Sequence, residues 1–386
     1  MSAQRRRRID VDGLDRLFGA LARRGYTLVG PTVRDGAIAY DELTSASELP
    51  IGWTDEQDGG RYRLTERADD ARFGYAVGPH SWKRYLFPPS LTLWRAQKNG
   101  NGSGFNVDEE TSEPPSYAFI GVRACELHAM GIQDRVFLNE RHPDPAYAAR
   151  RERAFIVAVD CTEPGGTCFC ASMGTGPKAT SGYDIALTEV VGEDEHYVVA
   201  QSGSDRGHDV LEEIEAPAAS SAEAQLARTL VDQAAQRMGR SMETEGIKEL
   251  LQNNAEHPRW ERIAERCLSC ANCTQVCPTC FCTTVDDVTD LTGQTADRVR
   301  YWDSCFNLSF SYIHGGSVRN ETSSRYRQWM THKLAHWIDQ FGTSGCVGCG
   351  RCITWCPVGI DITEEVRAIR DTRRDEPVAS ATEEEN

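Results

Sequence analysis

The spacing of apolar residues predicts that the N-terminal part of the chain is a small domain of helices and strands. A helix is predicted where apolar residues recur at helical spacing, at Leu14, Leu17, Phe18 and Leu21. Arg23, Arg24 and Gly25 then form the pattern of a helix end. Short apolar runs at 26–33 and 37–40, joined by turn-forming residues, predict a β-hairpin. We therefore expect residues 1–98 to form an α+β domain.

Residues 99–115 interrupt this pattern with alternating glycines, a cluster of acidic residues and two adjacent prolines. Such a polar stretch, rich in residues that break helices and strands, predicts a flexible linker or a long loop. Its glycines lack the G-x-G-x-x-G spacing of a dinucleotide-binding loop and do not lie between a strand and a helix. The segment therefore carries no fingerprint of nucleotide binding.

Strand-like and helix-like runs alternate after this segment. Strands are predicted at 117–122, 154–159, 183–191 and 197–200, and a short helix at 125–132. This alternation predicts an α/β domain over residues 116–215, with a cysteine- and glycine-rich loop after the second strand. Residues 216–258 are predicted to form a helical connector. The residues expected to face its core are Leu226, Leu230, Ala234 and Met238.

Residues 259–366 contain two cysteine runs with the same spacing, C-x2-C-x2-C-x3-C-P. Bacterial ferredoxins hold [4Fe–4S] clusters with this spacing, and in two-cluster proteins the fourth thiolate of each run binds the other cluster. The first cluster is thus assigned to Cys267, Cys270, Cys273 and Cys356. The second cluster is assigned to Cys346, Cys349, Cys352 and Cys277. Because aromatic residues recur at helical spacing between the runs, we expect a helix-rich, ferredoxin-like dicluster [4Fe–4S] domain.

Zinc sites are the alternative for the same cysteines. Zinc usually takes two separated C-x2-C pairs and not a run of four that ends in C-P, which favours the iron–sulfur interpretation. Glycines at 345, 348 and 350 would also let backbone N–H groups of the second run approach cluster sulfurs. The charged residues 367–386 are predicted to be a tail.

The amino-acid composition limits which partners the chain can bind and in which compartment we expect it. The 386-residue chain has a net charge of −16, which argues against binding to nucleic acid or anionic lipid. No run approaches the roughly 18 consecutive apolar residues of a membrane span. Arginines at 5–8 superficially suggest an export signal, but polar residues follow where an apolar segment would be needed. Fifteen cysteines without such a signal indicate the reducing cytoplasm.

Seven cysteines lie outside the two runs. Buried free cysteines are often inert, so packing is one explanation for them. The other explanation is a third iron–sulfur cluster, because two predicted strands of a parallel sheet would bring four cysteines to one edge of that sheet. These are Cys125, Cys161, Cys168 and Cys170, with Cys280 or Cys282 as substitute ligands. The Cys168-Phe-Cys170 pair would then have to lie in a turn, since neighbours on a strand point to opposite faces.

Several motifs resemble those of one protein family. They are Gly78-Pro79 with Trp82-Lys83, Gly121-Val-Arg-Ala-Cys125-Glu-Leu, Cys168-Phe-Cys170 with Met173-Gly-Thr-Gly-Pro177, Cys277-Pro-Thr-Cys280-Phe-Cys282, Ser324-Arg-Tyr-Arg327 and the second cysteine run. On these motifs the chain resembles, over nearly its whole length, the β (iron–sulfur) subunits of cytoplasmic NAD(P)-linked NiFe hydrogenases, the sulfhydrogenases. It is also similar to the anaerobic sulfite reductase component that shares this layout. Ala124 departs from the pattern where a proline is expected, at a position that binds no metal.

The resemblance implies an electron-transfer function. In such complexes this subunit relays electrons between the hydrogenase large and small subunits and a flavin subunit that binds NAD(P). The sequence itself agrees with an electron-transfer function, because the chain has two predicted clusters but no P-loop, nucleotide fingerprint or recognisable nucleophile–base pair. We therefore assign no catalytic residues and expect no complete active site. Electron delivery to sulfite reduction or to another reductase is the alternative function, and a free-standing redox protein is a third.

Overall fold

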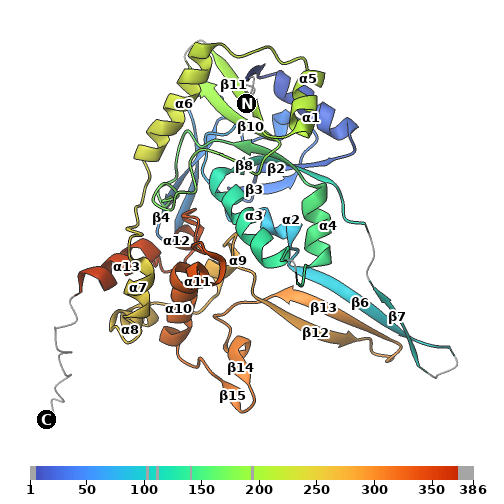
Figure 1. Cartoon of the computed structure of the whole chain (residues 1–386), viewed down its shortest axis with the longest axis vertical. Coiled ribbons are helices and arrows are strands. Elements are labelled where there is room, and N and C mark those ends of the chain that lie inside the picture. Colours follow the sequence, from blue (N-terminus) through green and yellow to red (C-terminus); the bar gives the residue numbers. More distant parts are fainter. Residues whose placement is uncertain (1–5, 101–103, 110–112, 140, 193–194, 373–386) are drawn as a thin grey trace.

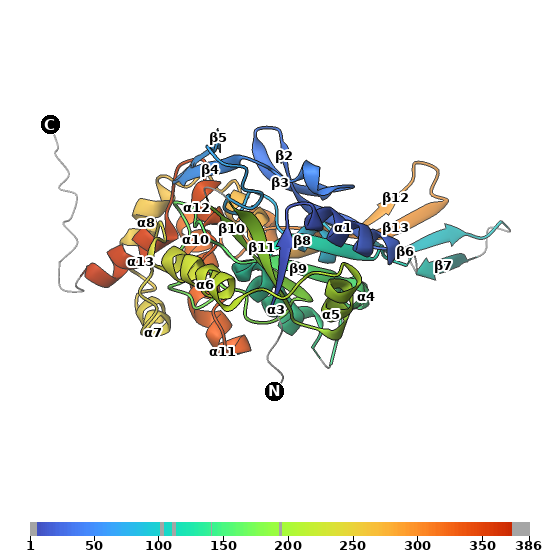
Figure 2. The same cartoon turned by 90° about the horizontal axis from the view of Figure 1, so that it is seen from above.

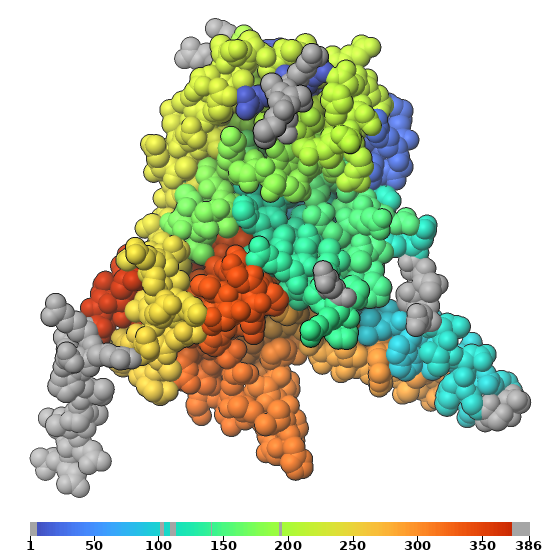
Figure 3. All heavy atoms as spheres, viewed as in Figure 1, coloured from blue at the N-terminus to red at the C-terminus, as the bar shows by residue number. Residues whose placement is uncertain are grey.

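The computed structural model describes residues 6–100, 104–109, 113–139, 141–192 and 195–372. A twisted sheet flanked by helices occupies the upper half of the molecule in Figure 1. The cysteine-rich helices lie below it on one side, and a second, narrower sheet extends on the other side (Figures 1 and 2). That sheet and a short hairpin stand out from the body as two protrusions in Figure 3.

The main sheet has seven strands in the order β1-β11-β10-β9-β8-β2-β3. These strands are β1 (Arg7–Asp10), β2 (Thr27–Arg34), β3 (Ala37–Glu42), β8 (Tyr117–Arg123), β9 (Phe155–Val159), β10 (Ile185–Val191) and β11 (His196–Ser202). The central strands β2, β8, β9 and β10 are parallel, and β3 and β11 flank them as antiparallel neighbours. At the edge of the sheet, β1 pairs antiparallel with β11. Parallel pairing requires crossover connections, so helices cover the sheet on both faces.

One face of the sheet packs against α1 (Gly13–Arg23) and α5 (Asp205–Glu213). The other face packs against α2 (Lys83–Leu86), α3 (Ala124–Phe137), α4 (Pro145–Arg153) and α6 (Ser221–Gln236). The helix predicted from Leu14, Leu17, Phe18 and Leu21 is α1, and all four side chains are buried. The hairpin predicted next is β2–β3. The result is a three-layer α/β/α arrangement.

A bulge in β8 sets the direction in which the chain enters α3. Gly121 has a φ of +86°, and the register with β9 shifts between Ile120 and Val122. A Cβ at Gly121 would lie 3.2 Å from Cδ of Pro31. Strict alternation would put Val122 and Phe119 on opposite faces, but both lie in the core on the α3 side. The bulge therefore realigns the end of β8, from which α3 begins.

The projecting sheet is antiparallel, with the order β12-β13-β6-β7. Its strands are β6 (Ser90–Lys98), β7 (Phe105–Glu109), β12 (Thr283–Thr289) and β13 (Thr295–Trp302). Two predictions are corrected here. The segment 99–115 is not only a linker, because β7 lies within it and pairs with β6. The insert between the cysteine runs is not only helical, because β12 and β13 form a hairpin that pairs with β6.

The C-terminal part is rich in short helices. They are α7 (Ile247–Gln252), α8 (Arg259–Ala264), α9 (Asn272–Gln275), α10 (Thr322–Thr331), a π-helix (His332–His336), α11 (Trp337–Phe341), α12 (Arg351–Thr354) and α13 (Ile362–Asp371). Their apolar side chains share one core with the cysteines of the two runs. Two separate hairpins complete the fold, β4 (Trp53–Asp58) with β5 (Arg61–Glu66) and β14 (Tyr312–Ile313) with β15 (Gly316–Ser317). The mixed α/β part and the helix-rich C-terminal part agree with the predicted fold class.

Three further predictions, two boundaries and one buried helix face, need correction. Residues 1–98 and 116–215 are not separate domains, because β1, β2 and β3 belong to the same sheet as β8–β11. Within α6, Ala234 is buried as predicted, but Leu226 is 45% exposed, and Ala224, Ala227 and Val231 complete the buried face. The predicted tail begins too early, since α13 continues to Asp371, and residues 373–386 lie outside the described part.

Among the described residues, no helix has both the length and the apolar character needed to cross a membrane.

Candidate metal centre

The two cysteine runs adopt the same backbone conformation. Ser269 and Ala271 in the first run have φ values of +50° and +66°, and Gly348 and Gly350, at the equivalent positions of the second run, have +66° and +75°. Residues with a side chain rarely adopt this left-handed conformation, so the match reflects a shared loop shape and not merely the freedom of glycine. Each loop leads into a short helix, α9 or α12. The chain thus presents two equivalent cysteine loops.

Backbone N–H groups point at cysteine sulfurs in both loops. The N–H of Ser269 donates to Sγ of Cys267, and the N–H of Gly348 donates to Sγ of Cys346, each over 3.4 Å. Hydrogen bonds of this kind stabilise negative charge on a metal-bound thiolate and influence the potential of a cluster. The loops are therefore arranged for anionic sulfur.

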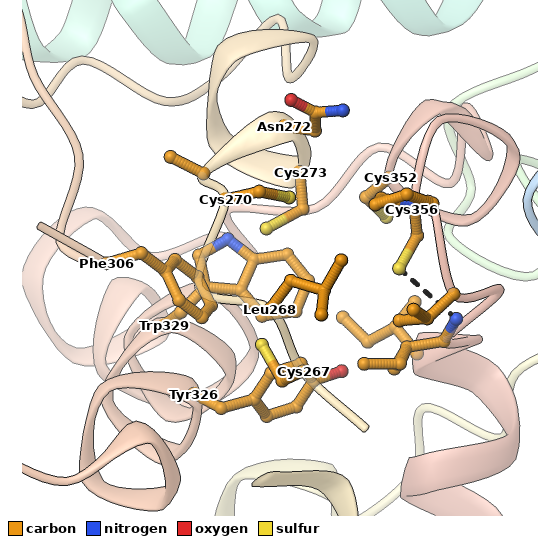
Figure 4. Close-up of a pocket in the computed structure, with 15 residues that line it drawn as sticks. Cys267, Leu268, Cys270, Asn272, Cys273, Phe306, Tyr326, Trp329, Cys352 and Cys356 are labelled. Carbon is orange, nitrogen blue, oxygen red and sulfur yellow. Dashed lines mark hydrogen bonds between the residues drawn. The ribbon is translucent and has the colours of Figure 1, made fainter. Parts of the chain in front are cut away.

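The first group of predicted ligands lines a single pocket. Cys267, Cys270, Cys273 and Cys356 come together there, and the sulfurs of Cys267, Cys273 and Cys356 point into the same space from different sides (Figure 4). The N–H of Ile360 donates to Sγ of Cys356 over 3.3 Å. The rest of the wall is mostly aromatic or aliphatic. It includes Leu268, Phe306, Tyr326, Trp329, Val358 and Ile362.

The second group of predicted ligands adjoins the first. Burial raises the pKa of Cys352 far above its usual value, and the neighbouring sulfurs of Cys346, Cys349 and Cys277 raise this pKa further. Burial likewise raises the pKa of Cys346 to about 12. Cys352 also lines the pocket of the first group, so the two sites share a wall. Cys352 thus has its three proposed co-ligands as neighbours, and Cys273 of the first group as well.

The donor set and its surroundings fit iron–sulfur clusters. Burial raises the pKa of Cys273, Cys346 and Cys352, and iron bound by these residues would supply the positive charge that favours their thiolate forms. Among the described residues, no three side chains of His, Cys, Asp or Glu converge tightly enough to hold one metal ion. The C-x2-C-x2-C-x3-C-P spacing of both runs suits a cluster better than it suits a single zinc ion.

The four cysteines predicted as a third site also lie together. Cys125 starts α3 after β8, and Cys161 follows β9, which is parallel to β8, so both reach the same sheet edge. Burial raises the pKa of Cys125, and the sulfurs of Cys170, Cys349 and Cys161 raise it further. Burial raises the pKa of Cys168 to about 12, with Cys161 as the next cause. The parallel sheet thus gathers these thiols as the sequence predicts.

A buried cation accompanies this third group. Arg123 is 1% exposed, and its Nη1 donates to Sγ of Cys161 over 3.7 Å. Its Nη2 donates to the carbonyls of Phe73 and Tyr75 over 2.8 and 2.9 Å, which fixes the guanidinium in place. A fixed positive charge favours the thiolate form of a neighbouring cysteine. The third group therefore also suits an anionic metal cluster.

The third group packs directly on the loop of the second. The N–H of Phe169 donates to the carbonyl of Gly348 over 2.8 Å, and Sγ of Cys168 lies 3.9 Å from the carbonyl oxygen of Cys349. A Cβ at Gly348 would lie 2.7 Å from the backbone of Cys170, and one at Gly350 would lie 2.4 Å from Oγ1 of Thr167. Glycine is thus needed at both positions for close approach of the two loops.

The remaining cysteines have different partners from those proposed for them. Cys280 contacts Cys277, and this thiol together with the ammonium of Lys333 holds the pKa of Cys277 well below its usual value. Cys282 contacts Cys305, which lowers the pKa of Cys282 to about 7. Their contacts are therefore with the second cysteine group and with each other. The role of substitute ligands in the third group finds no support in these contacts.

A buried ion pair that the sequence did not reveal joins the two parts of the fold. Arg351 of α12 and Glu126 of α3 are both fully buried, with Nη2 and Oε1 2.5 Å apart. Glu126 also accepts hydrogen bonds from Tyr40 Oη at 2.8 Å and from Trp82 Nε1 at 2.9 Å. The only hint in the sequence was that both residues lie beside cysteines within the family motifs.

The first group lies nearest to solvent. Cys270 is exposed, and Leu268 beside it is 64% exposed, whereas Cys349 of the second group and Cys168 of the third are buried. Of the three groups, the first is therefore the one that reaches the protein surface.

Comparison with known proteins identifies relatives of this arrangement. The family model of the 4Fe-4S dicluster domain matches residues 266–360, which contain both cysteine loops. The chain is 33% identical, over 344 residues, to sulfhydrogenase 2 subunit beta of Pyrococcus furiosus, and the match covers 88% of this chain and 91% of the relative. No solved structure matches the chain significantly.

Proposed function

The chain belongs to the family of sulfhydrogenase β subunits, and from this premise we propose that it is the electron-transfer iron–sulfur subunit of a multisubunit NAD(P)-linked NiFe hydrogenase. Its partners would be the hydrogenase large and small subunits and a flavin subunit that binds NAD(P). The fifteen cysteines, all free, favour a reducing compartment, and the proposal places the complex in the cytoplasm.

The observation that carries this proposal is the row of adjoining cysteine groups. The third group packs on the loop of the second through Phe169 and Gly348, and Cys352 of the second group forms part of the first pocket. The first group includes Cys270, which is exposed at the protein surface. Each [4Fe–4S] cluster, when bound, accepts and releases one electron. A row of such sites, from the edge of the α/β sheet to the surface, suits the relay of electrons between two partner subunits.

We assign the eight cysteines of the two runs as ligands. Cys267, Cys270, Cys273 and Cys356 would hold the first cluster, and Cys346, Cys349, Cys352 and Cys277 the second. We further propose a third cluster held by Cys125, Cys161, Cys168 and Cys170. What supports it is the burial of these thiols, their position at one sheet edge and the cation of Arg123 beside them.

Iron analysis tests the third cluster. Anaerobically purified protein should contain about twelve iron atoms and as many acid-labile sulfides per chain, whereas two clusters alone would give about eight. Cys168→Ala should lower the count by about four and leave the spectra of the ferredoxin-type clusters intact. As a matched control, Cys305→Ala should keep the wild-type count. If Cys168→Ala retains all of its iron, there is no third cluster and these thiols only pack.

The proposed function predicts a division of activities between the subunits. The isolated chain should accept electrons from reduced dyes but should neither oxidise H2 nor reduce NAD(P)+, because we find no nucleotide-binding fingerprint in it. In the assembled complex, Cys349→Ser should abolish H2-dependent reduction of NAD(P)+ while the hydrogenase subunits still pass electrons to dyes.

Two results would contradict this function. Tight binding and turnover of NADPH by the isolated chain would mean that it has an active site of its own. Purification of the native chain with a sirohaem reductase, and without NiFe subunits, would favour the alternative of electron delivery to sulfite reduction.

A further inference from the structure

Lys333 carries a positive charge that is buried against the second cysteine group. Its side chain is on the π-helix His332–His336 and the residue is 6% exposed. Its Nζ lies 3.3 Å from Sγ of Cys277 and 3.7 Å from Sγ of Cys280. It also donates to Oγ1 of Thr279 over 3.1 Å and to the carbonyl of Gly345 over 3.2 Å. Departures from α-helical geometry of this kind often occur at functional sites.

A buried ammonium is unstable unless an anion compensates it. Within the part of the chain that the structure describes, none of the hydrogen bonds of Lys333 Nζ goes to a carboxylate. The groups that surround its Nζ are instead two sulfurs, a hydroxyl and a carbonyl. Only the sulfurs can carry negative charge, so the thiolate ligands of the second cluster are the natural counter-charge.

Lys83 places a second buried cation behind the same segment. It is 5% exposed, and its Nζ donates to the carbonyl of Cys280 over 3.1 Å and lies 3.8 Å from the ring centre of Trp302. The hydrogen bonds of Lys83 Nζ go to backbone carbonyls and not to a cysteine sulfur. Its charge therefore acts on the second group only through its electric field.

The first group has different surroundings. No lysine or arginine is among the residues that line its pocket, which is mostly aromatic and aliphatic apart from the cysteines (Figure 4). The two predicted clusters thus have the same kind of ligands and the same loop shape, but a buried cation lies beside the second group and none lines the pocket of the first. Hydrogen bonds to the sulfurs and nearby charge are two of the factors that set the potential of an iron–sulfur cluster.

We propose that Lys333 raises the reduction potential of the second cluster above that of the first, so that an electron shared between these two clusters rests at the second. Reduction adds one electron and breaks no bond, and the ammonium stabilises the extra negative charge next to Cys277. The inference rests on the proposed assignment of Cys277, Cys346, Cys349 and Cys352 to one cluster. In this role Lys333 is a positioning and charge-compensating residue and not a catalytic one.

A redox titration followed by EPR tests this proposal with the full chain. Lys333→Met should keep the wild-type iron content and shift the signal of the second cluster to a lower potential. We expect at least a tenfold change in its electron-transfer equilibrium, which corresponds to about 59 mV for a one-electron couple. The signal of the first cluster should stay in place. Lys333→Arg should retain most of the wild-type potential, because it keeps the charge.

Two further variants make the outcome decisive. Lys248→Met is the matched control, because Lys248 pairs with Asp339 on the surface and should change neither potential. Lys83→Met should lower the same signal by a smaller amount, and it carries the test if Lys333→Met loses iron. Full iron content with an unchanged potential in Lys333→Met, or equal shifts of both signals, would overturn the proposal. If Cys277→Ser and Cys346→Ser lost iron from different clusters, the assignment of both cysteines to one cluster would be wrong.

Discussion

Glu126→Gln is expected to lower the free energy of unfolding by about 3–5 kcal/mol, because it leaves the buried guanidinium of Arg351 without its counter-ion. Arg351 has no exposed surface, and its other hydrogen bonds go to the neutral carbonyls of Gly78 and His80, both at 2.9 Å. The amide of glutamine would still accept from Tyr40 and Trp82, so the loss would reflect charge more than shape. Anaerobic denaturant unfolding of the iron-loaded protein measures the effect.

The control for this variant is an exposed ion pair. Glu213 bonds to Arg23 and Arg24 at the surface, and Glu213→Gln should leave the unfolding midpoint almost unchanged because solvent screens such pairs. The double variant Glu126→Met with Arg351→Met should be more stable than Glu126→Gln, since no unpaired charge remains. A loss below about 1 kcal/mol for Glu126→Gln would mean that the pair does not hold α3 and α12 together as described.

Cys349→Ser is expected to remove or convert the second cluster, with a loss of up to about four iron atoms per chain. In the proposed assignment Cys277 and Cys356 cross between the runs, so the change should also loosen the first run. Wild-type protein reduced with dithionite should give the EPR spectrum of interacting [4Fe–4S] centres, and the variant should lose this interaction.

The control for this change is a cysteine to which we assign no cluster. Cys282→Ser should leave both the iron content and the interacting spectrum as in the wild type. Stoichiometric zinc with little iron, in protein never exposed to oxygen, would refute the cluster assignment as a whole.

Local patterns were sufficient for much of the candidate site. The cysteine spacing assigned ligands to two groups, and the neighbours of Cys352 agree with that assignment. The strand pattern before Cys125 and Cys161 was sufficient to predict that a parallel sheet brings them to one edge, because β8 and β9 each end just before the cysteine. The family resemblance inferred from the motifs is confirmed by the match to a sulfhydrogenase β subunit.

Other features depend on contacts between distant segments. The sequence did not predict that β2 pairs with β8, which joins residues 1–98 to the sheet of 116–215. It did not predict that β13 pairs with β6 across almost 200 residues of chain, as the register of Thr295 opposite Gln97 shows. Helical periodicity identified only part of the buried face of α6, because Ala234 is buried but Leu226 is exposed and Ala227 is buried in its place.

The sequence by itself determined which cysteines form each loop. The reason is that the spacing of cysteines over a few residues decides both which of them can bind one cluster and what shape the loop takes. Only the tertiary structure decided which charges face those loops. Lys333 reaches Cys277 and Arg351 reaches Glu126 across long separations in the chain. Whether a charge is buried, and against which partner, depends on how helices and sheet pack together, and no local pattern of apolar and polar residues encodes that choice.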